Sequence, residues 1–553
     1  MSHWLITPVV LPAMLAAILV LMVREHIVVQ RALSMAGALA LTAISIGLFW
    51  QASDGTITLY QLGNWPAPFG IVLVADRLST LMVLLTTLMA PLVLLYVIGS
   101  GWDTRGRHFH PLFQFQLMGI IGAFLTGDAF NLFVFFEVLL IASYGLMIHA
   151  GGKARLRAGT QYVLYNLLGS TLFLFALGTI YAKTGTLNLA DLALRVAELD
   201  PGASAGIRVA AVLLLLVFAI KAALLPLHFW LPDSYAEAPA PVAALFAIMT
   251  KVGAYGIIRV YTLVFPPDLE ITQGLFDTWL LPAALLTLGL GMIGVLGATR
   301  IDRLVAFSAI GSMGLLLSAV AVFTPGGIAA ALYYAVHSTF ATAALFLLVD
   351  QIKSRRGDTG PLLMHGRPIE GGALVAGMFF VAAIAMTGLP PLSGFLGKLL
   401  ILDAATASPL VWWVWAVVLL GSLVALVGFS RAGSLIFWKA HQLEPDGPGG
   451  PVDPETAPEV EVTTAQPETT AGPLAPRPVL PMIAIGGLIA LLIALTAFAG
   501  PVNRALNATA AQLFAPAPYV ELVLNTPGKV IKKDTHAGED DHDAAAEATG
   551  EEH

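Results

Sequence analysis

The sequence predicts an all-α, polytopic membrane protein with about 14 transmembrane helices in one bundle, and three observations indicate this fold. Hydrophobic residues make up 57% of the 553 residues and charged residues only 11%, a composition outside the range of soluble domains. Apolar runs that are long enough to cross a bilayer, which takes ~20 residues, recur along the chain. Basic residues cluster in alternate loops between these runs.

Fourteen apolar runs follow one another along the chain. The first has no basic stretch before it and no small-residue cleavage site, so we expect it to be retained as a transmembrane helix. The runs cover residues 4–23, 32–50, 77–99, 109–126, 129–150, 159–182, 208–231, 240–264, 277–299, 303–323, 327–350, 372–402, 409–438 and 479–500.

The loops that carry most of the basic residues alternate along the chain. By the positive-inside rule these loops are cytoplasmic, which places both termini outside. The loop after the seventh run departs from the pattern, since it has Asp233 and Glu237 but no Lys or Arg, and the loop before that run carries three basic residues. The basic loops hold Arg24 and Arg31; Arg105 and Arg107; Lys153, Arg155 and Arg157; Arg300 and Arg303; and Lys353, Arg355, Arg356 and Arg367.

The runs divide the chain into six expected parts. These are three N-terminal transmembrane helices (1–108), a first five-helix unit (109–264), a second five-helix unit (277–440), a flexible acidic Pro-rich loop (441–478), a last transmembrane helix with an amphipathic stretch (479–514) and a disordered acidic tail (515–553). The loop and the tail contain too few large apolar residues to fold. The tail holds three histidines, but such charge runs are usually solvated, so no metal site is expected.

Five ionisable residues lie near the middle of apolar runs: Glu137, Lys221, Lys251, His337 and Lys398. A charge at this depth costs roughly 2.5 to 3.5 kcal/mol on insertion scales, so five in one chain indicate a common task. We interpret them as a proton path. Cysteine is absent, which excludes thiolate ligation of iron–sulfur clusters or structural zinc by this chain. No cofactor is expected, and redox chemistry would require another subunit.

Two of the runs are interrupted by proline. Pro226 and Pro232 follow Lys221, whereas Pro390 and Pro391 precede Lys398. Proline removes a backbone donor and clashes one turn back, so both the seventh and the twelfth helices should be broken. The reversed order of lysine and break is what an inverted-topology repeat predicts, with the functional site near the midplane.

Three long motifs resemble one known family. They are TGDAFNLFVFFEVLLIASYGL around Glu137, IKAALLPLHFWLPDSYAEAPAPVAALFAIMTKVGAYGIIRV around Lys221 and Lys251, and GLPPLSGFLGK ending at Lys398. They are similar to the antiporter-like subunits of respiratory complex I, membrane-bound hydrogenases and Mrp-type multi-subunit cation/proton antiporters, over roughly residues 70 to 440. The segment YAKTGTLNLADL is most similar to the D subunits of the Mrp type.

The resemblance implies a subunit with fourteen helices, two inverted five-helix units and a membrane-embedded proton path. The family's acidic residue falls on Glu137, and its lysines fall on Lys221, Lys251 and Lys398. One departure concerns a basic residue that many members carry five positions after the histidine of the eleventh helix. Thr342 takes that place, so His337, together with water, is left to connect the two halves.

Charge alone suggests a mechanism. If Glu137 and Lys221 pair at about 4 Å with an effective dielectric near 20, they attract by roughly 4 kcal/mol. While the pair is closed, Lys221 holds its proton, and opening it favours transfer to Lys251. The proton would continue through water to His337, whose side chain suits a relay, and then to Lys398, which would exchange it with one side. His228, beside the first break, is a further relay candidate or a cap for broken backbone.

Each residue also has a structural interpretation. Glu137 and Lys221 form a static ion pair in this alternative, the other lysines extend toward the interface, and His337 makes an ordinary interhelical hydrogen bond. Asp128 is expected to begin a helix rather than bind a cation. The GxGxxG pattern inside the ninth run has no preceding strand, so it indicates close helix packing and not a dinucleotide site.

The predicted function is therefore proton translocation by a membrane subunit of a multi-subunit Na+ or K+/proton antiporter in the bacterial inner membrane. It is not expected to be an enzyme, and its partners would be the other antiporter subunits, the lipid bilayer, protons and the cation. The net charge of -7 argues against a nucleic-acid partner. Two alternatives remain: a proton-pumping subunit of an NADH:quinone oxidoreductase or hydrogenase, and a scaffold subunit that transports nothing.

Overall fold

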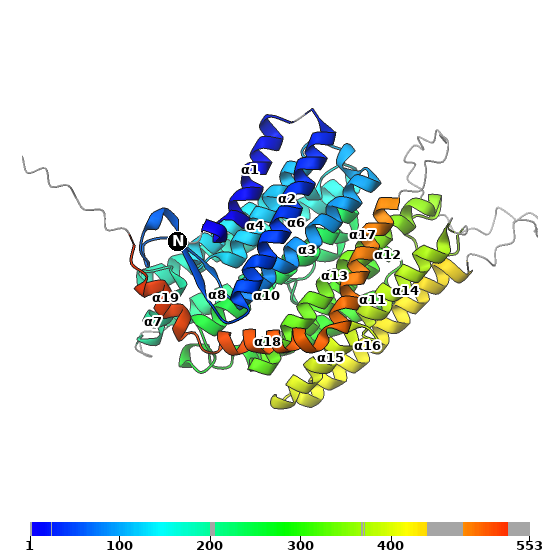
Figure 1. Ribbon diagram of the computed structural model, residues 1–553. Helices are drawn as coiled ribbons and strands as arrows, with labels where there is room; N and C mark the ends of the chain where they lie inside the picture. Colours follow the sequence, from blue (N-terminus) through cyan, green and yellow to red (C-terminus); the bar gives the residue numbers. More distant parts are fainter. Residues whose placement is uncertain are drawn as a thin grey trace, which may run out of the picture.

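The computed structural model describes residues 3–23, 25–199, 205–366, 369, 371–439 and 479–528. Most of the described chain is helical, and the long helices run side by side as one bundle (Figure 1). Ten helices in this part are long and apolar enough to cross a membrane, and three shorter apolar helices accompany them. The all-α, multi-pass fold is thus confirmed, and each of the fourteen predicted runs holds a helix or a broken pair of helices. The count of fourteen crossings stays a prediction.

The N-terminal part consists of three helices and one hairpin. Its elements are α1 (Thr7–Leu21), α2 (Ile27–Ala52), β1 (Thr58–Gln61), β2 (Val72–Ala75) and α3 (Arg77–Ser100). The strands pair antiparallel, with Thr58 opposite Ala75. Asp76 then begins α3 with a capping box: its side chain accepts from the Ser79 backbone N–H at 2.8 Å, and its own N–H donates to Ser79 Oγ at 2.9 Å. This box satisfies two N–H groups that the first turn leaves without partners.

Two sets of helices then follow the same packing order. The first set contains α4 (Phe109–Leu125), α5 (Ala129–Met147), α6 (Lys153–Thr184), α8 (Ala205–Lys221), α9 (Trp230–Glu237) and α10 (Ala240–Leu263), with the short α7 (Leu189–Ala197) between α6 and α8. The second set contains α11 (Leu281–Gly297), α12 (Ile301–Val322), α13 (Pro325–Arg355), α14 (Gly372–Thr387), α15 (Ser393–Ala404) and α16 (Val411–Gly433).

Corresponding helices of the two sets have corresponding neighbours. In the first set, α4 packs on α5, α5 on α6, α6 on both α8 and α9, and α8 on α10. In the second, α11 packs on α12, α12 on α13, α13 on both α14 and α15, and α14 on α16. This correspondence is what two related five-helix units require.

The two predicted helix breaks are present. The seventh run splits into α8, which ends at Lys221, and α9, and the twelfth run splits into α14 and α15 around Pro390 and Pro391. Side chains satisfy the broken backbone: Trp230 Nε1 donates to the Ile220 carbonyl at 3.0 Å, and the Leu225 N–H donates to Thr287 Oγ1 at 2.9 Å. Irregular backbone at this depth is tolerated because protein groups surround it.

Helices α10 and α13 form the centre of the bundle. They pack on each other and so join the two sets, while α9 packs on α12. The part of α10 that is long enough to cross a membrane is wholly buried inside the protein, and the corresponding part of α13 is nearly so. Side chains on these two helices are therefore shielded from lipid. In contrast, only a third or less of the corresponding stretches of α2, α6 and α16 is buried inside the protein.

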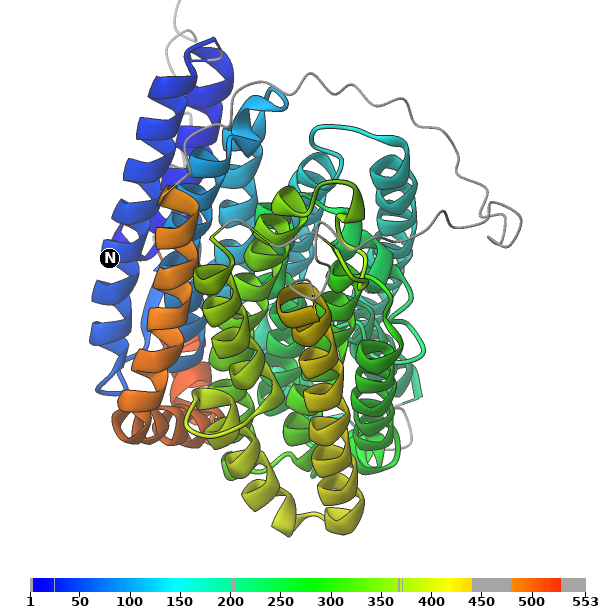
Figure 2. The same cartoon turned by 90° about the vertical axis from the view of Figure 1, so that its right-hand side faces the viewer.

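The C-terminal helices close one end of the bundle. Helix α17 (Val479–Ala497) packs on α3 and α13, and α18 (Ala499–Leu513) then turns across the ends of α3, α10 and α13 (Figures 1 and 2). Helix α19 (Ala517–Asn525) follows. The expected boundary of the disordered tail at residue 515 is therefore wrong, because Tyr519, Val520 and Val523 are buried and fix a helix there. Residues 440–478 and 529–553, which cover most of the expected loop and tail, lie outside the described residues.

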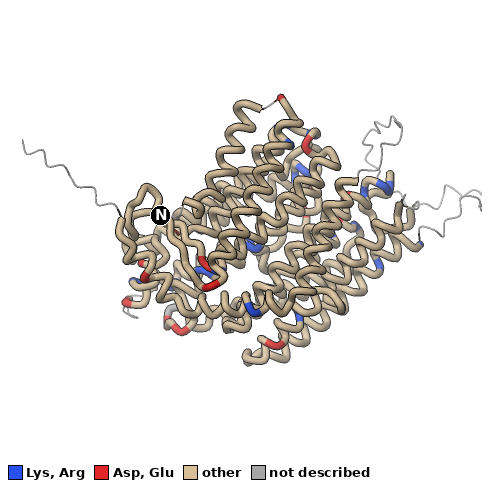
Figure 3. The backbone as a smooth tube through the Cα atoms, viewed as in Figure 1, with Lys and Arg blue, Asp and Glu red and all other residues tan. Residues whose placement is uncertain are grey.

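Charged residues gather at the ends of the helices (Figure 3). At the end that carries the predicted basic loops, Arg300 NH2 lies 2.9 Å from Glu237 Oε1 and 2.8 Å from Asp302 Oδ2, and Arg303 pairs with Asp233. These contacts explain the acidic loop after the seventh run. Its two carboxylates are neutralised by arginines at the start of α12, so the basic-loop side keeps its positive excess.

Candidate functional site

The four basic residues of the predicted path are buried in the protein. Their exposed fractions are 4% for Lys221, 1% for Lys251, 0% for His337 and 7% for Lys398. Lys251 and His337 lie near the middle of the central helices α10 and α13, and the other two lie beside the helix breaks. Glu137, near the middle of α5, is half-buried. None of the lysines reaches the interface.

Glu137 and Lys221 do not form the direct ion pair that the sequence led us to expect. No carboxylate oxygen in the described part of the chain lies within 4.0 Å of Lys221 Nζ. Helix α6 packs on both α5 and α8 and supplies two polar side chains: Ser170 Oγ donates to Glu137 Oε1, and Lys221 Nζ lies 3.5 Å from Asn166 Oδ1. Attraction falls with distance, so the pair is weaker than the roughly 4 kcal/mol expected for contact.

Asn166 and Ser170 were missed in the sequence. They lie four residues apart and so share one face of α6, which is a detectable pattern in an apolar run. Together with Lys221 they line a cavity of about 20 Å³. A cavity needs about 10 to 15 Å³ to hold one water. Glu137 and Lys221 are therefore connected through α6, with room for one water beside the lysine.

Lys251 has no fixed partner. No hydrogen-bond acceptor in the described part of the chain reaches its Nζ atom, and it lines a cavity of about 10 Å³ with mainly apolar neighbours such as Leu78, Met82 and Leu316. A lysine without a counter-ion in such surroundings is costly. It is the residue of the path for which a purely structural role is hardest to maintain.

His337 lies at the second helix break. Its Nδ1 atom is 2.9 Å from Ser393 Oγ, at the start of α15. Its Nε2 atom, Tyr334 Oη and Thr342 Oγ1 are all buried on α13 without a hydrogen-bond partner among the described residues. Buried polar atoms are rarely left unpaired, so these are places where water is expected. The structure thus shows the interhelical bond of the structural interpretation together with an unused ring nitrogen.

Lys398 on α15 caps the C-terminal end of α14. Its Nζ atom donates to the Thr387 carbonyl at 2.5 Å and to Ser422 Oγ at 2.8 Å. Thr387 is the last residue of α14, where unpaired carbonyls give a partial negative charge that favours a cation. The lysine also folds over Gly388, since a Cβ atom there would lie 2.6 Å from Lys398 Cδ. Both Lys398 and Lys251 are within electrostatic range of His337.

Two other candidates stand apart from this group. His228 is half-buried, its ring lies tilted against that of Phe229 with centroids 4.3 Å apart, and its Nδ1 atom has no partner in the described part of the chain. Among the described residues, no hydrogen bond joins it to a residue of the predicted path. Asp128 caps α5, because its Oδ1 accepts from the Asn131 N–H at 2.8 Å. Burial raises the pKa of this carboxyl. The expectation that it begins a helix is confirmed.

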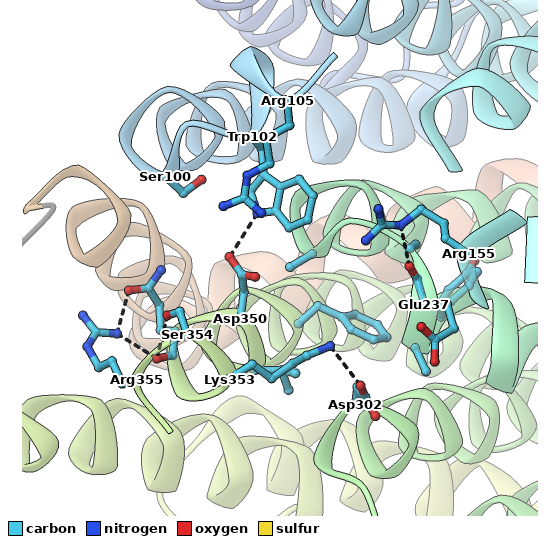
Figure 4. A pocket seen from close by; sticks show the side chains of 17 residues that line it. Ser100, Trp102, Arg105, Arg155, Glu237, Asp302, Asp350, Lys353, Ser354 and Arg355 are labelled. Carbon is cyan, nitrogen blue, oxygen red and sulfur yellow. Dashed lines mark hydrogen bonds and ion pairs between the residues drawn. The ribbon is translucent and has the colours of Figure 1, made fainter. Parts of the chain in front are cut away.

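A cavity of about 640 Å³ opens on the basic-loop side between the start of α10 and the end of α13 (Figure 4). Charged side chains of both signs line it. One is Asp350, whose Oδ2 accepts from Trp102 Nε1 at 3.1 Å and from Tyr96 Oη at 2.7 Å. Lys353 donates to Asp302 at 3.1 Å. The cavity therefore brings a polar space to the two helices that carry Lys251 and His337.

Comparison with known proteins shows which family has this arrangement. Residues 126–424 match the family described as NADH:quinone oxidoreductase/Mrp antiporter, TM. The chain belongs to this family. The D subunit of a probable K(+)/H(+) antiporter from Rhizobium meliloti is 38% identical over 560 residues, which cover 95% of this chain and 98% of the relative. The D subunit of the Na(+)/H(+) antiporter of Bacillus subtilis is 41% identical over 442 residues, covering 79% and 87%.

Solved structures agree with the family assignment. The Mrp complex from Dietzia sp. DQ12-45-1b contains a chain with a TM-score of 0.80 at 28% identity, and the match covers 95% of this chain and 100% of that one. Respiratory complex I from Thermus thermophilus contains another, with a TM-score of 0.73 at 26% identity, covering 92% and 99%. The chain is thus an antiporter-type membrane subunit, a transporter and not an enzyme, and a multi-pass protein of the bacterial inner membrane. Its partners are other subunits.

Proposed function

We propose that the chain is the proton-translocating subunit of a multi-subunit Na+ or K+/proton antiporter, and that Glu137, Lys221, Lys251, His337 and Lys398 carry the protons. The observation that supports the path best is that Lys251 is buried without a counter-ion. It lies between the polar groups of the path that stand beside the two helix breaks. A structural lysine would have a carboxylate or carbonyl in reach. The names of the relatives, which refer to exchange of K+ or Na+ for protons, support the cation class.

Protons would reach the path from the cavity on the basic-loop side. Tyr235 on α9 and Phe346 on α13 line the cavity, and their ring centroids are 5.9 Å apart. His337 lies nine positions before Phe346 on α13, which is about 14 Å of helix at ~1.5 Å per residue. Water must bridge this distance during transport, and the unpaired polar atoms of α13 are suitable sites for it. His228 is assigned no part in this route.

Glu137 and Lys221 would act through α6. In the resting arrangement Ser170 holds the carboxylate and Asn166 faces the ammonium. Movement of α6 relative to α5 and α8 would change the separation of the two charges, and with it the tendency of Lys221 to give up its proton. At about 8 Å the attraction is roughly 2 kcal/mol with a dielectric near 20. Driving one charge across 100 mV takes about 2.3 kcal/mol, so a change of this size is sufficient to control the step.

Exchange assays on the assembled complex in vesicles test the proposal. Glu137→Ala and Lys221→Ala should each abolish proton-coupled cation exchange while the complex still assembles. Lys398→Ala should also be inactive. Wild-type exchange in the first two variants would contradict the assigned roles and would favour a scaffold subunit. Replacing Na+ by K+ or Li+ in the same assay identifies the cation.

A second candidate function rests on the likeness to respiratory complex I, which extends over 92% of this chain. In that case the same residues would pump protons for an NADH:quinone oxidoreductase. The purified complex would then contain flavin or iron–sulfur subunits, because this chain has no cysteine to bind a cluster. Purification without such subunits, and with exchange activity, would exclude this candidate.

A further inference from the structure

A buried ion pair lies at the end of the bundle opposite the basic loops. Arg259 on α10 forms two hydrogen bonds with Asp76, at 2.6 Å to Oδ2 and 2.7 Å to Oδ1. The exposed fractions of the two side chains are only 5% and 3%. Asp76 is the residue that begins α3, so the pair joins α3 to the central helix. Two-pronged contacts of this kind are the strongest ion pairs, and separating a buried one leaves both charges uncompensated.

The ion pair is connected to Lys251 by one face of α10. Lys251, Tyr255 and Arg259 follow at intervals of four residues, which places them in one row along the helix. Tyr255 lines the same cavity as Lys251. Its hydroxyl oxygen lies 3.3 Å from Arg259 Nε and donates to the Phe124 carbonyl at 2.8 Å. Polar groups therefore lead from the partnerless lysine to the ion pair, and the cavity occupies the gap between them.

The outer surface of the pair is covered by the C-terminal segment. The Arg259 guanidinium lies 5.6 Å from the ring of Tyr519 on α19 and 5.6 Å from that of Tyr255, so it is within cation–π range of two aromatic rings. Tyr519 is buried, and a Cβ atom on Gly127 would lie 3.0 Å from its hydroxyl oxygen. The Tyr519 hydroxyl is therefore packed closely against Gly127. The cavity of Lys251 is thus closed toward this side by the ion pair and its aromatic cover.

We propose that Asp76 and Arg259, covered by Tyr519, form a gate between the Lys251 cavity and the aqueous phase opposite the basic loops. This proposal rests on the proposed function, because the gate matters only if Lys251 carries protons. When the pair is closed, the lysine communicates with His337 and the cavity on the basic-loop side. When the pair separates, water enters between α3 and α10, and Lys251 reaches the other phase. Asp76, Arg259 and Tyr519 are positioning residues here and need not hold the transported proton.

The absence of cysteine from the chain allows a direct test of access. Ala254 lines the Lys251 cavity and is 3% exposed. In the assembled complex, Ala254→Cys would be exposed to silver ions, which are small and thiol-specific, from the side of the β1–β2 hairpin. Thiols that remain free are then labelled after denaturation. We expect the cysteine to be protected in the otherwise unchanged chain and to react at least tenfold faster when Asp76→Asn is added.

Two further variants separate a gate from a mere structural link. Asp191→Asn removes an exposed ion pair with Arg195 in α7 and should leave the thiol protected. Exchanging the charges, with Asp76→Arg and Arg259→Asp together, should restore protection. A thiol that stays protected in Asp76→Asn, or that already reacts in the unchanged chain, would overturn the proposal.

The test remains decisive if Asp76→Asn fails to assemble. Tyr519→Ala removes only the cover and must then also make the Ala254→Cys thiol react faster, whereas Tyr519→Phe must not. Unchanged reactivity in Tyr519→Ala would overturn the gate in the same way. Silver labelling requires no transport, so a failed gate is distinguishable from a failed proton path, which the exchange assay of Lys251 variants reports.

Discussion

Replacing Lys251 by methionine should make the protein more stable and inactive at the same time. Lys251 is 1% exposed, has mainly apolar neighbours and has no acceptor in reach among the described residues. Methionine has a similar volume and no charge. Insertion scales assign about 2.5 to 3.5 kcal/mol to a lysine at this depth. The adjacent cavity has room for at most about one water, which relieves part of this cost. We therefore expect Lys251→Met to stabilise the protein by about 2 kcal/mol.

Lys398→Met is the matched control, because the same change is made at a lysine that has partners. Lys398 Nζ donates to the Thr387 carbonyl and to Ser422 Oγ, and a hydrogen bond from a charged group contributes about 1.5 to 3 kcal/mol. Removing the ammonium leaves the end of α14 without its cap. The stability gained by removing a buried charge is then offset by the loss of these hydrogen bonds, so Lys398→Met should be neutral or destabilising. Both variants should lose exchange.

The measurement is unfolding of the purified complex by titration with sodium dodecyl sulfate, paired with exchange in vesicles. The two lysines have almost equal burial, so the difference between the variants reports their partners. If Lys251→Met were as destabilising as Lys398→Met, Lys251 would have a structural partner and its assignment to the path would be wrong. Retained exchange in Lys251→Met would refute the assignment directly.

Three other changes have defined outcomes. Ser170→Ala removes a hydrogen bond to Glu137 and should lower the exchange rate about tenfold, since such bonds contribute at least ~1.5 kcal/mol. Gly388→Ala places a Cβ atom 2.6 Å from the lysine of α15 at φ +80° and should abolish exchange. Burial alone would raise the pKa of Asp103, but hydrogen bonds from a histidine and from Arg31 lower it to about 2. Asp103→Asn should therefore lower the free energy of unfolding by about 1 to 2 kcal/mol at pH 7. This loss of stability should disappear as the pH falls from about 4 toward 2.

Each of these changes has a control in the same chain. Thr171→Ala removes a hydroxyl of α6 that bonds only the Leu167 carbonyl, so exchange should persist. Gly371→Ala imposes the same backbone strain at φ +66° but meets nothing within 4 Å, and it should remain active. Asp191→Asn breaks an exposed pair and should change the unfolding titration little. If a control variant showed the same effect as the variant it is matched to, the predicted effect would not be specific.

Much of the fold followed from the sequence because lipid imposes simple requirements. Length and apolarity placed every helix of the predicted runs, and the prolines beside Lys221 and Lys398 identified both breaks, since a missing N–H and a steric clash act locally. The α18 and α19 segment was harder to foresee. Its helices are short, and α19 is fixed by burial of Tyr519 in a distant junction, which no local pattern reveals.

The burial of the basic residues was predictable from their places in apolar runs, but their contacts were not. Glu137 and Lys221 were identified from their depth, yet the sequence could not show that side chains of α6 contact both of them, because depth carries no information about which helices are neighbours. For the same reason the pair of Asp76 and Arg259 was missed. Its residues are 183 positions apart, and each taken alone resembles an interfacial charge.

The two small cavities beside Lys221 and Lys251, about 20 and 10 Å³, have a consequence for leakage. Grotthuss transfer needs an unbroken file of hydrogen-bonded molecules, and these spaces admit about one molecule each. At rest these two lysines are therefore not joined to a continuous chain of water, and proton conduction requires the transient entry of more water. The membrane that holds this protein would therefore keep its proton-motive force between turnovers, and the route would not need to be blocked permanently along its whole length.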